Sequence, residues 1–134
     1  MIQTQRSPLA LILTLCFSLV LVSACSDSNE APAGPLRILI TNDDGVGAPG
    51  IDAVVQAVIQ DPNNAVIVSA PAMNRSGSAD NTIDTLPACG TGDATASETM
   101  SGYDTDVWAV DGCPADSVLY ALNNLYLDGP PHVV

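Results

Sequence analysis

Apolar and polar residues follow one another in regular blocks along most of this chain. Short apolar runs rich in β-branched residues are typical of buried strands, and apolar residues spaced three and four apart are typical of amphipathic helices. By these two patterns, strands are predicted at 36–41, 65–69 and 105–110, and helices at 51–60 and 114–127. A strand, a helix and a strand within about 30 residues predict parallel strands joined by a right-handed crossover. The pattern therefore predicts an α/β fold with a mainly parallel sheet.

Two further segments complete this prediction. Residues 70–101 form a long polar stretch with few large apolar side chains, in which one edge strand is expected near Thr82–Leu86. His132–Val134 follow the second helix and are expected to begin another parallel strand. Because that strand would only just have begun, we interpret residues 36–134 as the truncated N-terminal part of a longer domain.

The first 35 residues have a different pattern. Residues 9–22 are a nearly continuous apolar run of 14 residues, too short for a membrane-spanning helix but typical of a secretory signal peptide. The sequence Val-Ser-Ala-Cys that ends at Cys25 is similar to a bacterial lipobox. We expect a lipoprotein-type signal peptide at 1–24, a lipid on Cys25 and a flexible tether at 25–35. The chain would then be an exported, periplasm-facing membrane lipoprotein, and Ser26 favours the outer membrane; an ordinary signal peptide and an uncleaved anchor stay open.

The charge of the chain excludes several classes of binding partner and site. Lys and Arg together number 3 against 15 Asp and Glu, a net charge of −12, and all the basic residues are arginines. Binding to a nucleic-acid polymer depends on many Lys and Arg contacts with phosphates, so no such partner is expected. A Walker-type phosphate loop is excluded because it needs a lysine. Docking on anionic lipids through charge is disfavoured for the same reason.

The cysteines leave one question open. Cys16 lies in the signal segment and Cys25 is the expected lipid site. Cys89 and Cys113 could pair in an oxidising compartment, or could remain a loop cysteine and a buried cysteine. Their spacing contains no metal-binding pattern, and His132, the one histidine of the chain, is assigned to packing.

Two polar motifs are expected to meet at the carboxyl edge of the sheet. Asn42-Asp43-Asp44-Gly45 follows the first strand, and Asn74-Arg75-Ser76-Gly77 lies in the loop after the second. Open parallel sheets bind ligands outside the carboxyl ends of their strands, and neighbouring strands place these two loops side by side. Adjacent carboxylates favour a hard divalent cation, to which Ser76 could add a hydroxyl oxygen. From the residues alone, a capped turn and a solvated turn remain the alternatives.

Two other kinds of site share features with this region. Gly45–Gly50 fits the G-x-G-x-x-G pattern of dinucleotide sites, but two carboxylates precede it, and the second strand ends without an acidic residue for the ribose. A phospho-acceptor receiver domain also carries an acidic pair after its first strand, but it needs a lysine that this chain lacks. At the start of the second helix, Asp116 is interpreted as a helix cap.

Four segments together resemble the survival protein E (SurE) family of 5′/3′-nucleotidases. RILITNDDGVGAPGI resembles the family's first strand and metal loop, and SAPAMNRSGSA resembles its second motif. VDGCPADSV resembles a third motif, with Cys113 in place of the usual threonine, and PHVV resembles the start of a further strand. The resemblance runs from Leu36 to Val134 and implies a Rossmann-like fold of three layers, αβα, with a mainly parallel sheet.

The resemblance also implies an activity and a site. The activity is that of a divalent-metal-dependent phosphohydrolase, which releases phosphate from nucleoside 5′- or 3′-monophosphates with one Mg²⁺ or Mn²⁺. Asp43 and Asp44 would be the catalytic and metal-binding carboxylates, and Ser76 would be a third metal ligand. The residues implied for binding the substrate phosphate are Asn42, Arg75 and Gly77.

Two departures from the family pattern are visible. The first is that the family's fourth metal ligand, an asparagine, would fall past Val134. A full-length relative is also expected to form a homodimer or a larger assembly. The export signal departs from a family that is mainly cytoplasmic. The non-enzymatic alternative is an exported or lipid-anchored remnant or binding protein that keeps the metal loop without catalysis.

Overall fold

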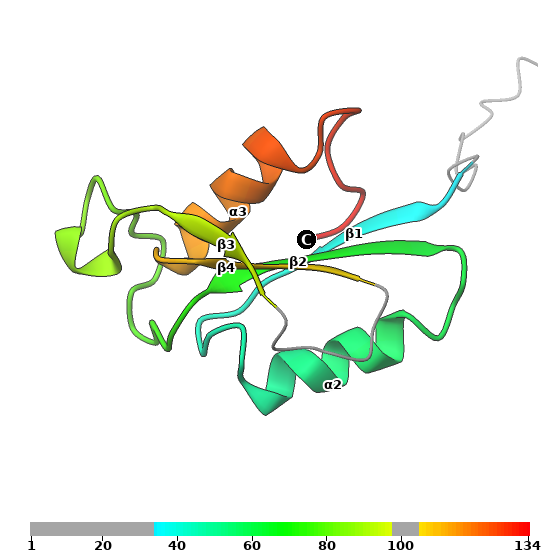
Figure 1. Cartoon of the computed structure of the whole chain (residues 1–134), viewed down its shortest axis with the longest axis horizontal. Helices are drawn as coiled ribbons and strands as arrows, with labels where there is room; N and C mark the ends of the chain where they lie inside the picture. The colour runs from blue at the N-terminus through cyan, green and yellow to red at the C-terminus, as the bar shows by residue number, and fades with distance from the viewer. Residues whose placement is uncertain (1–33, 98–104) are drawn as a thin grey trace, which may run out of the picture. The chain divides into compact units, whose positions relative to one another are not determined.

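The computed structural model describes residues 34–97 and 105–134, and its centre is a four-stranded sheet (Figure 1). The strands are ordered β1-β2-β4-β3 across the sheet. Three of them are parallel and are β1 (Leu36–Ile40), β2 (Asn64–Pro71) and β4 (Asp106–Val110). The short β3 (Ala94–Ala96) runs antiparallel to β4.

Two helices cover opposite faces of this sheet, as Figure 1 shows. The helix α2 (Pro49–Val58) connects β1 to β2, and α3 (Pro114–Asn124) follows β4. Both helices begin with a proline, whose missing N–H costs nothing at a position where no helical partner exists. The arrangement confirms the predicted α/β fold of three layers.

The core divides into two clusters because successive residues of a strand point to opposite faces. Ile40 and Val68 lie in the cluster on the α2 side, together with Val55 of that helix. Leu39 lies in the cluster on the α3 side with Ala121. Leu39 and Val55 are 1% and 0% exposed, and burying each such side chain stabilises the fold by about 1.5–3 kcal/mol.

The structure corrects one predicted strand. Residues Thr82–Leu86, where an edge strand was expected, form a turn in which the Thr82 carbonyl accepts hydrogen bonds from the amides of Thr85 and Leu86. The edge strand is instead β3, and a short 3₁₀ helix, η1 (Pro87–Cys89), separates it from that turn. Thr82 and Ile83 favour a strand by propensity, but pairing with β4 decides which segment becomes the edge strand.

The structure tests the predictions for the C-terminal residues but not those for the first 33 residues. Val133 forms a parallel bridge with Ile38 of β1, which agrees with the expected start of another parallel strand. His132, which was assigned to packing, is exposed, and its ring accepts a hydrogen bond from the Arg37 amide. Within the described ranges, none of the helices is long and apolar enough to cross a membrane. The predicted signal peptide and the lipid site at Cys25 lie outside the described residues.

Candidate metal and phosphate site

The loop after β1 is a turn that displays two carboxylates. The Asn42 side chain closes the turn, because its amide donates to the Gly45 carbonyl and its oxygen accepts from the Gly45 amide, both at 3.1 Å. Asp43 and Asp44 occupy the two central positions of this turn and are exposed. Asn42 therefore shapes the loop, and the two aspartates remain accessible to a ligand.

The loop after β2 meets this turn from the side. The Asn74 amide and the Ser76 hydroxyl both donate to the same oxygen of Asp44, Oδ1, at 3.0 and 3.2 Å. The backbone N–H of Arg75 donates to the carbonyl of Asp43 at 2.6 Å. The predicted meeting of the two motifs is thus present.

Close contact between the two loops requires a glycine in the first. Gly45 has a φ of +103°, and a Cβ atom there would lie 2.9 Å from the backbone carbon of Met73. The amide of Val46 also donates to the carbonyl of Pro71 at 2.8 Å. The Gly-rich segment 45–50 accordingly makes a tight turn and opens α2, a role that needs no dinucleotide.

The atoms gathered here suit a hard divalent cation. Carboxylate, hydroxyl and amide oxygens are the ligands that Mg²⁺ and Mn²⁺ prefer. The Ser76 hydroxyl and the Asp44 carboxylate are close enough to share one ion, and the exposed Asp43 carboxylate is adjacent in the chain. Gly77 follows at the rim, exposed and with a φ of +86°. The residues predicted as ligands therefore fit the group that they were predicted to bind.

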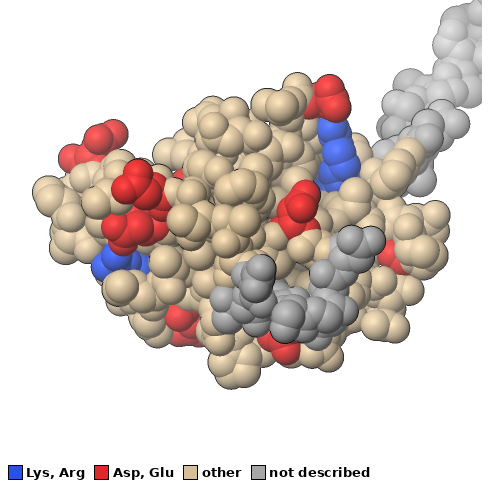
Figure 2. Space-filling view, viewed as in Figure 1, with Lys and Arg blue, Asp and Glu red and all other residues tan. Residues whose placement is uncertain are grey.

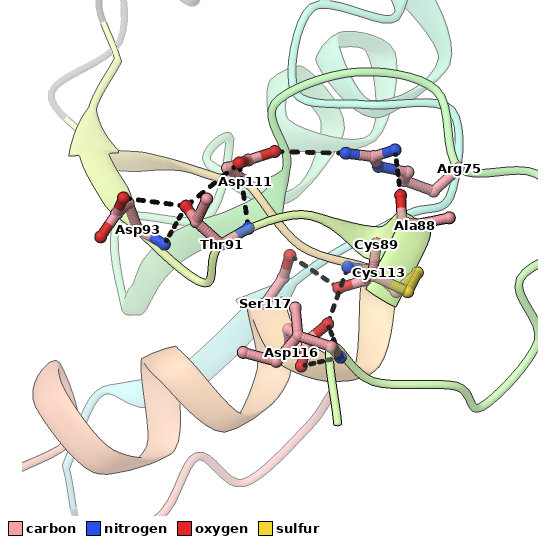
Figure 3. Close-up of polar contacts among 10 residues, drawn as sticks. Arg75, Ala88, Cys89, Thr91, Asp93, Asp111, Cys113, Asp116 and Ser117 are labelled. Atoms are coloured by element: carbon pink, nitrogen blue, oxygen red, sulfur yellow. Dashed lines mark hydrogen bonds and ion pairs between the residues drawn. A yellow bond between two sulfur atoms is a disulfide. The ribbon is translucent and has the colours of Figure 1, made fainter. Parts of the chain in front are cut away.

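The guanidinium of Arg75 points away from the two aspartates. It donates to the carbonyl of Ala88 at 2.9 Å and pairs with Asp111 at 3.2 Å (Figure 3). Hydrogen bonds from the amide and hydroxyl of Thr91, followed by the charge of Arg75, hold the pKa of Asp111 below its usual value. Arg75 was predicted to bind phosphate, and in this structure its charged group is already engaged.

Asp111 is a member of the site region that the sequence analysis did not single out. It stands directly after β4, the third parallel strand, so its position at the carboxyl edge follows the same rule as Asp43 and Asp44. Its pairing with Arg75 joins residues 36 apart in the sequence, a contact that no local pattern reveals.

A second cluster of ligand-type residues lies beside Asp111, but it is not a metal site. Cys89 and Cys113 form a disulfide with a Cα–Cα distance of 5.0 Å, which resolves the alternatives left open for them. Asp116, whose carboxylate oxygen is near both sulfurs, accepts hydrogen bonds from the amides of Cys113 and Ile83. The helix-cap role predicted for Asp116 is confirmed, and the disulfide leaves no thiolate to bind a metal.

The candidate site belongs to a strongly acidic chain, with a net charge of −12. Figure 2 shows basic side chains on the face drawn as two separate spots, each with acidic side chains beside it. Arg37 and Arg75 are the basic residues of the described ranges, and Arg37 donates to the carbonyls of Asp128 and Gly129. A divalent cation bound at the two aspartates would partly offset this excess of negative charge.

A cavity of about 840 Å³ lies at the other end of the sheet. Its lining includes Arg37, Asn64 and Asp106, which stand at the starts of the three parallel strands. Ligands of open parallel sheets bind at the carboxyl ends, so this cavity is separate from the carboxylate loops.

Comparison with known proteins identifies the family. A model described as "Survival protein SurE" matches residues 38–134, which include both loops, the disulfide and α3. This chain belongs to the SurE family. Proteins named 5′-nucleotidase SurE from Jannaschia sp., Vibrio parahaemolyticus and Acinetobacter baumannii are 35%, 37% and 42% identical to it, over 74%, 75% and 68% of this chain.

The SurE match covers only part of each relative. The aligned region is 35%, 34% and 31% of these three proteins, so the chain spans about a third of the length of the curated relatives it matches. The carboxylate turn and the loop that holds it fall inside this shared third.

Proposed function

We propose that this chain supplies the metal-binding part of a phosphohydrolase site for nucleoside monophosphates. The observation that carries the proposal is the shared oxygen of Asp44, on which Asn74 and Ser76 converge from a loop 30 residues away. The name 5′-nucleotidase, given to several relatives, supports the substrate class. The 3′ activity that the resemblance implies is part of the same proposal.

In this proposal Asp43, Asp44 and Ser76 hold one Mg²⁺ or Mn²⁺. The chemistry that such an ion supplies is neutralisation of the phosphate charge and activation of a water. Asp43 is exposed, and its carboxylate makes no hydrogen bond to residues 34–97 or 105–134, so it is free to orient that water. Asn42 keeps both carboxylates presented by closing the turn beneath them.

The phosphate would lie over the second loop. Ser76 and Gly77 are exposed there, and the missing side chain of Gly77 lets an anion approach the backbone closely. The two terminal nitrogens of the Arg75 guanidinium are engaged with Ala88 and Asp111, and its Nε is buried. Its contribution to phosphate binding is therefore its nearby positive charge.

Metal binding by this chain is the direct test. We expect Mn²⁺ to broaden the amide resonances of residues 43–45 and 74–77, and we expect Asp44→Asn to abolish this effect. Asp61→Asn, an exposed carboxylate at the far end of α2, is the matched control and should bind as the parent does. Broadening that survives in Asp44→Asn would contradict the proposal.

Activity is tested in a hybrid protein. Residues 38–134 would replace the corresponding segment of the Vibrio parahaemolyticus relative, which supplies the other two thirds of its length. We expect Mn²⁺-dependent phosphate release from 5′-AMP and 3′-AMP, lost on Asp44→Asn. A folded hybrid that is inactive while the intact relative is active would favour the non-catalytic alternative.

We also propose that the chain is exported and lipid-anchored through Cys25. The Cys89–Cys113 disulfide supports this, because stable disulfides form mainly in oxidising compartments. A fatty-acid probe should label the expressed chain and not its Cys25→Ala variant, and labelling of that variant would contradict the anchor. A dimer or larger assembly remains a prediction, which light scattering of the hybrid would test.

A further inference from the structure

Arg75 joins two parts of the carboxyl edge. Its backbone N–H donates to the carbonyl of Asp43, in the turn that carries the two exposed carboxylates. Its side chain extends the other way and ends on Ala88 and Asp111, as Figure 3 shows. One residue thus connects the β1 turn to the segment that follows β4.

The Asp111 carboxylate is itself held on its other side. Its second oxygen, Oδ2, accepts from the amide and the hydroxyl of Thr91, both at 3.1 Å. Gly90 packs so closely that a Cβ atom there would overlap Oδ1 of Asp111. The amide of Gly92 donates to the Asp111 carbonyl at 2.8 Å. Asp111 therefore offers Arg75 an acceptor that is fixed before any ligand arrives.

The disulfide fixes the distance between the two acceptors of Arg75. Ala88 directly precedes Cys89, and Asp111 stands two residues before Cys113. The two cysteines are 0% and 1% exposed, so the bond is part of the packed interior. The guanidinium of Arg75 consequently binds two acceptors, on Ala88 and Asp111, that are held at a fixed separation.

We propose that Asp111 is a positioning residue of the metal site and acts through Arg75. Asn74 and Ser76 flank Arg75 in the chain, so anchoring Arg75 orders both of the side chains that converge on Asp44. Side chains ordered in advance lose less conformational entropy when they bind a ligand, which raises affinity. The inference rests on the proposed metal site and adds the residue that keeps it assembled.

The experiment measures Mn²⁺ affinity of the whole chain by the spectroscopic signal of free Mn²⁺. Asp111→Asn keeps the size of the side chain and removes its charge, and we expect it to weaken Mn²⁺ binding about tenfold. Asp93→Asn is the matched control, because it removes a neighbouring charge that contacts Thr91 and not Arg75. Its Mn²⁺ affinity should stay within about twofold of the parent.

A second measurement separates positioning from simple loss of charge. In the metal-free protein, the Arg75 amide hydrogen that bonds to Asp43 should exchange with solvent faster in Asp111→Asn and at the parent rate in Asp93→Asn. Should Asp111→Asn fail to fold, Arg75→Lys tests the same contact from its other partner, because one ammonium group cannot reproduce both bonds of the guanidinium. We expect the same weakening of Mn²⁺ binding from it.

The outcomes separate this inference from the function on which it rests. Unchanged Mn²⁺ affinity in Asp111→Asn, with binding lost in Asp44→Asn, would overturn the positioning role and leave the metal site standing. Equal weakening by Asp111→Asn and Asp93→Asn would also overturn it, because charge alone would then account for the effect. A parent chain that binds no Mn²⁺ at the Asp44 site would overturn both.

Discussion

The two loops that form the candidate site are built in opposite ways. The turn after β1 is short, closed by the single side chain of Asn42, and exposes Asp43 and Asp44. The long segment after β2 is fixed by a disulfide, a hydrogen-bonded Asp111 and a tightly packed Gly90. The first loop thus depends on one closing side chain, whereas the second is fixed by several independent contacts.

Removing the disulfide that fixes the second loop should have the largest effect on stability. Cys89→Ala with Cys113→Ala opens a link between residues 24 apart, and the free energy of unfolding should fall by about 3 kcal/mol. Urea unfolding measures this loss. Cys25→Ala is the control and should leave the stability of the folded part unchanged. An unchanged unfolding midpoint in the double variant would show that packing alone fixes the second loop.

Adding a methyl group at Gly90 should have the second largest effect on stability. Gly90→Ala must keep a φ of +130° and would press on Asp111, so we expect a loss of about 2 kcal/mol in the free energy of unfolding. Gly77→Ala is the matched control, because Gly77 also has a positive φ but no atom lies within 4 Å of its Cβ position. Its loss should be about 1 kcal/mol, from backbone strain alone. Equal losses would mean that contact with Asp111 is not tight.

The turn after β1 should depend on one side chain. Asn42→Ala removes both bonds that close the turn, and we expect a loss of about 1 kcal/mol in stability together with weaker Mn²⁺ binding. Gln56→Ala, on the exposed face of α2, should change stability by less than about 0.5 kcal/mol and leave Mn²⁺ affinity intact. If Asn42→Ala bound Mn²⁺ normally, the turn would not need its closing side chain.

The smallest expected effect is a dependence on pH. Folding lowers the pKa of Asp111 from its ordinary value of 3.8. The ionised carboxylate therefore stabilises the folded chain fully above pH 3.8, and this stabilisation is lost as the pH falls through the lower pKa of the folded state. The difference in unfolding free energy between the parent and Asp111→Asn should therefore shrink at pH values below 3.8. Denaturant titrations from neutral to acidic pH measure it, and a difference that grows on acidification would contradict the assignment.

Local pattern predicted most of the fold because the strands and helices are apolar on the faces they bury. The i, i+3, i+4 spacing in α2 and the β-branched runs of β1 and β2 are such cases. The strand β3 was missed because its three residues, Ala-Thr-Ala, carry no apolar run and depend on pairing with β4. Propensity describes a segment in isolation, and an edge strand is defined by its neighbour.

The candidate site was predictable in part, because topology alone determines which loops lie side by side. Topology alone places the ends of neighbouring parallel strands together, so Asp44 and Ser76 could be expected to meet. The disulfide and the Arg75–Asp111 pair could not, because spacing in the sequence does not give the distance between Cα atoms or the direction of a side chain. These contacts depend on how the long second loop folds.

The bridge between Val133 and Ile38 covers a sheet edge that could otherwise pair with other molecules. Without a neighbour, the outer side of β1 would present unpaired N–H and C=O groups, which are a template for strands of other molecules. The Val133 carbonyl accepts from the Leu39 amide at 3.0 Å, and the His132 amide donates to the Arg37 carbonyl at 2.8 Å. The His132 ring accepts the Arg37 amide at 2.9 Å. Two residues of β1, Arg37 and Leu39, are thus kept from intermolecular pairing by His132 and Val133.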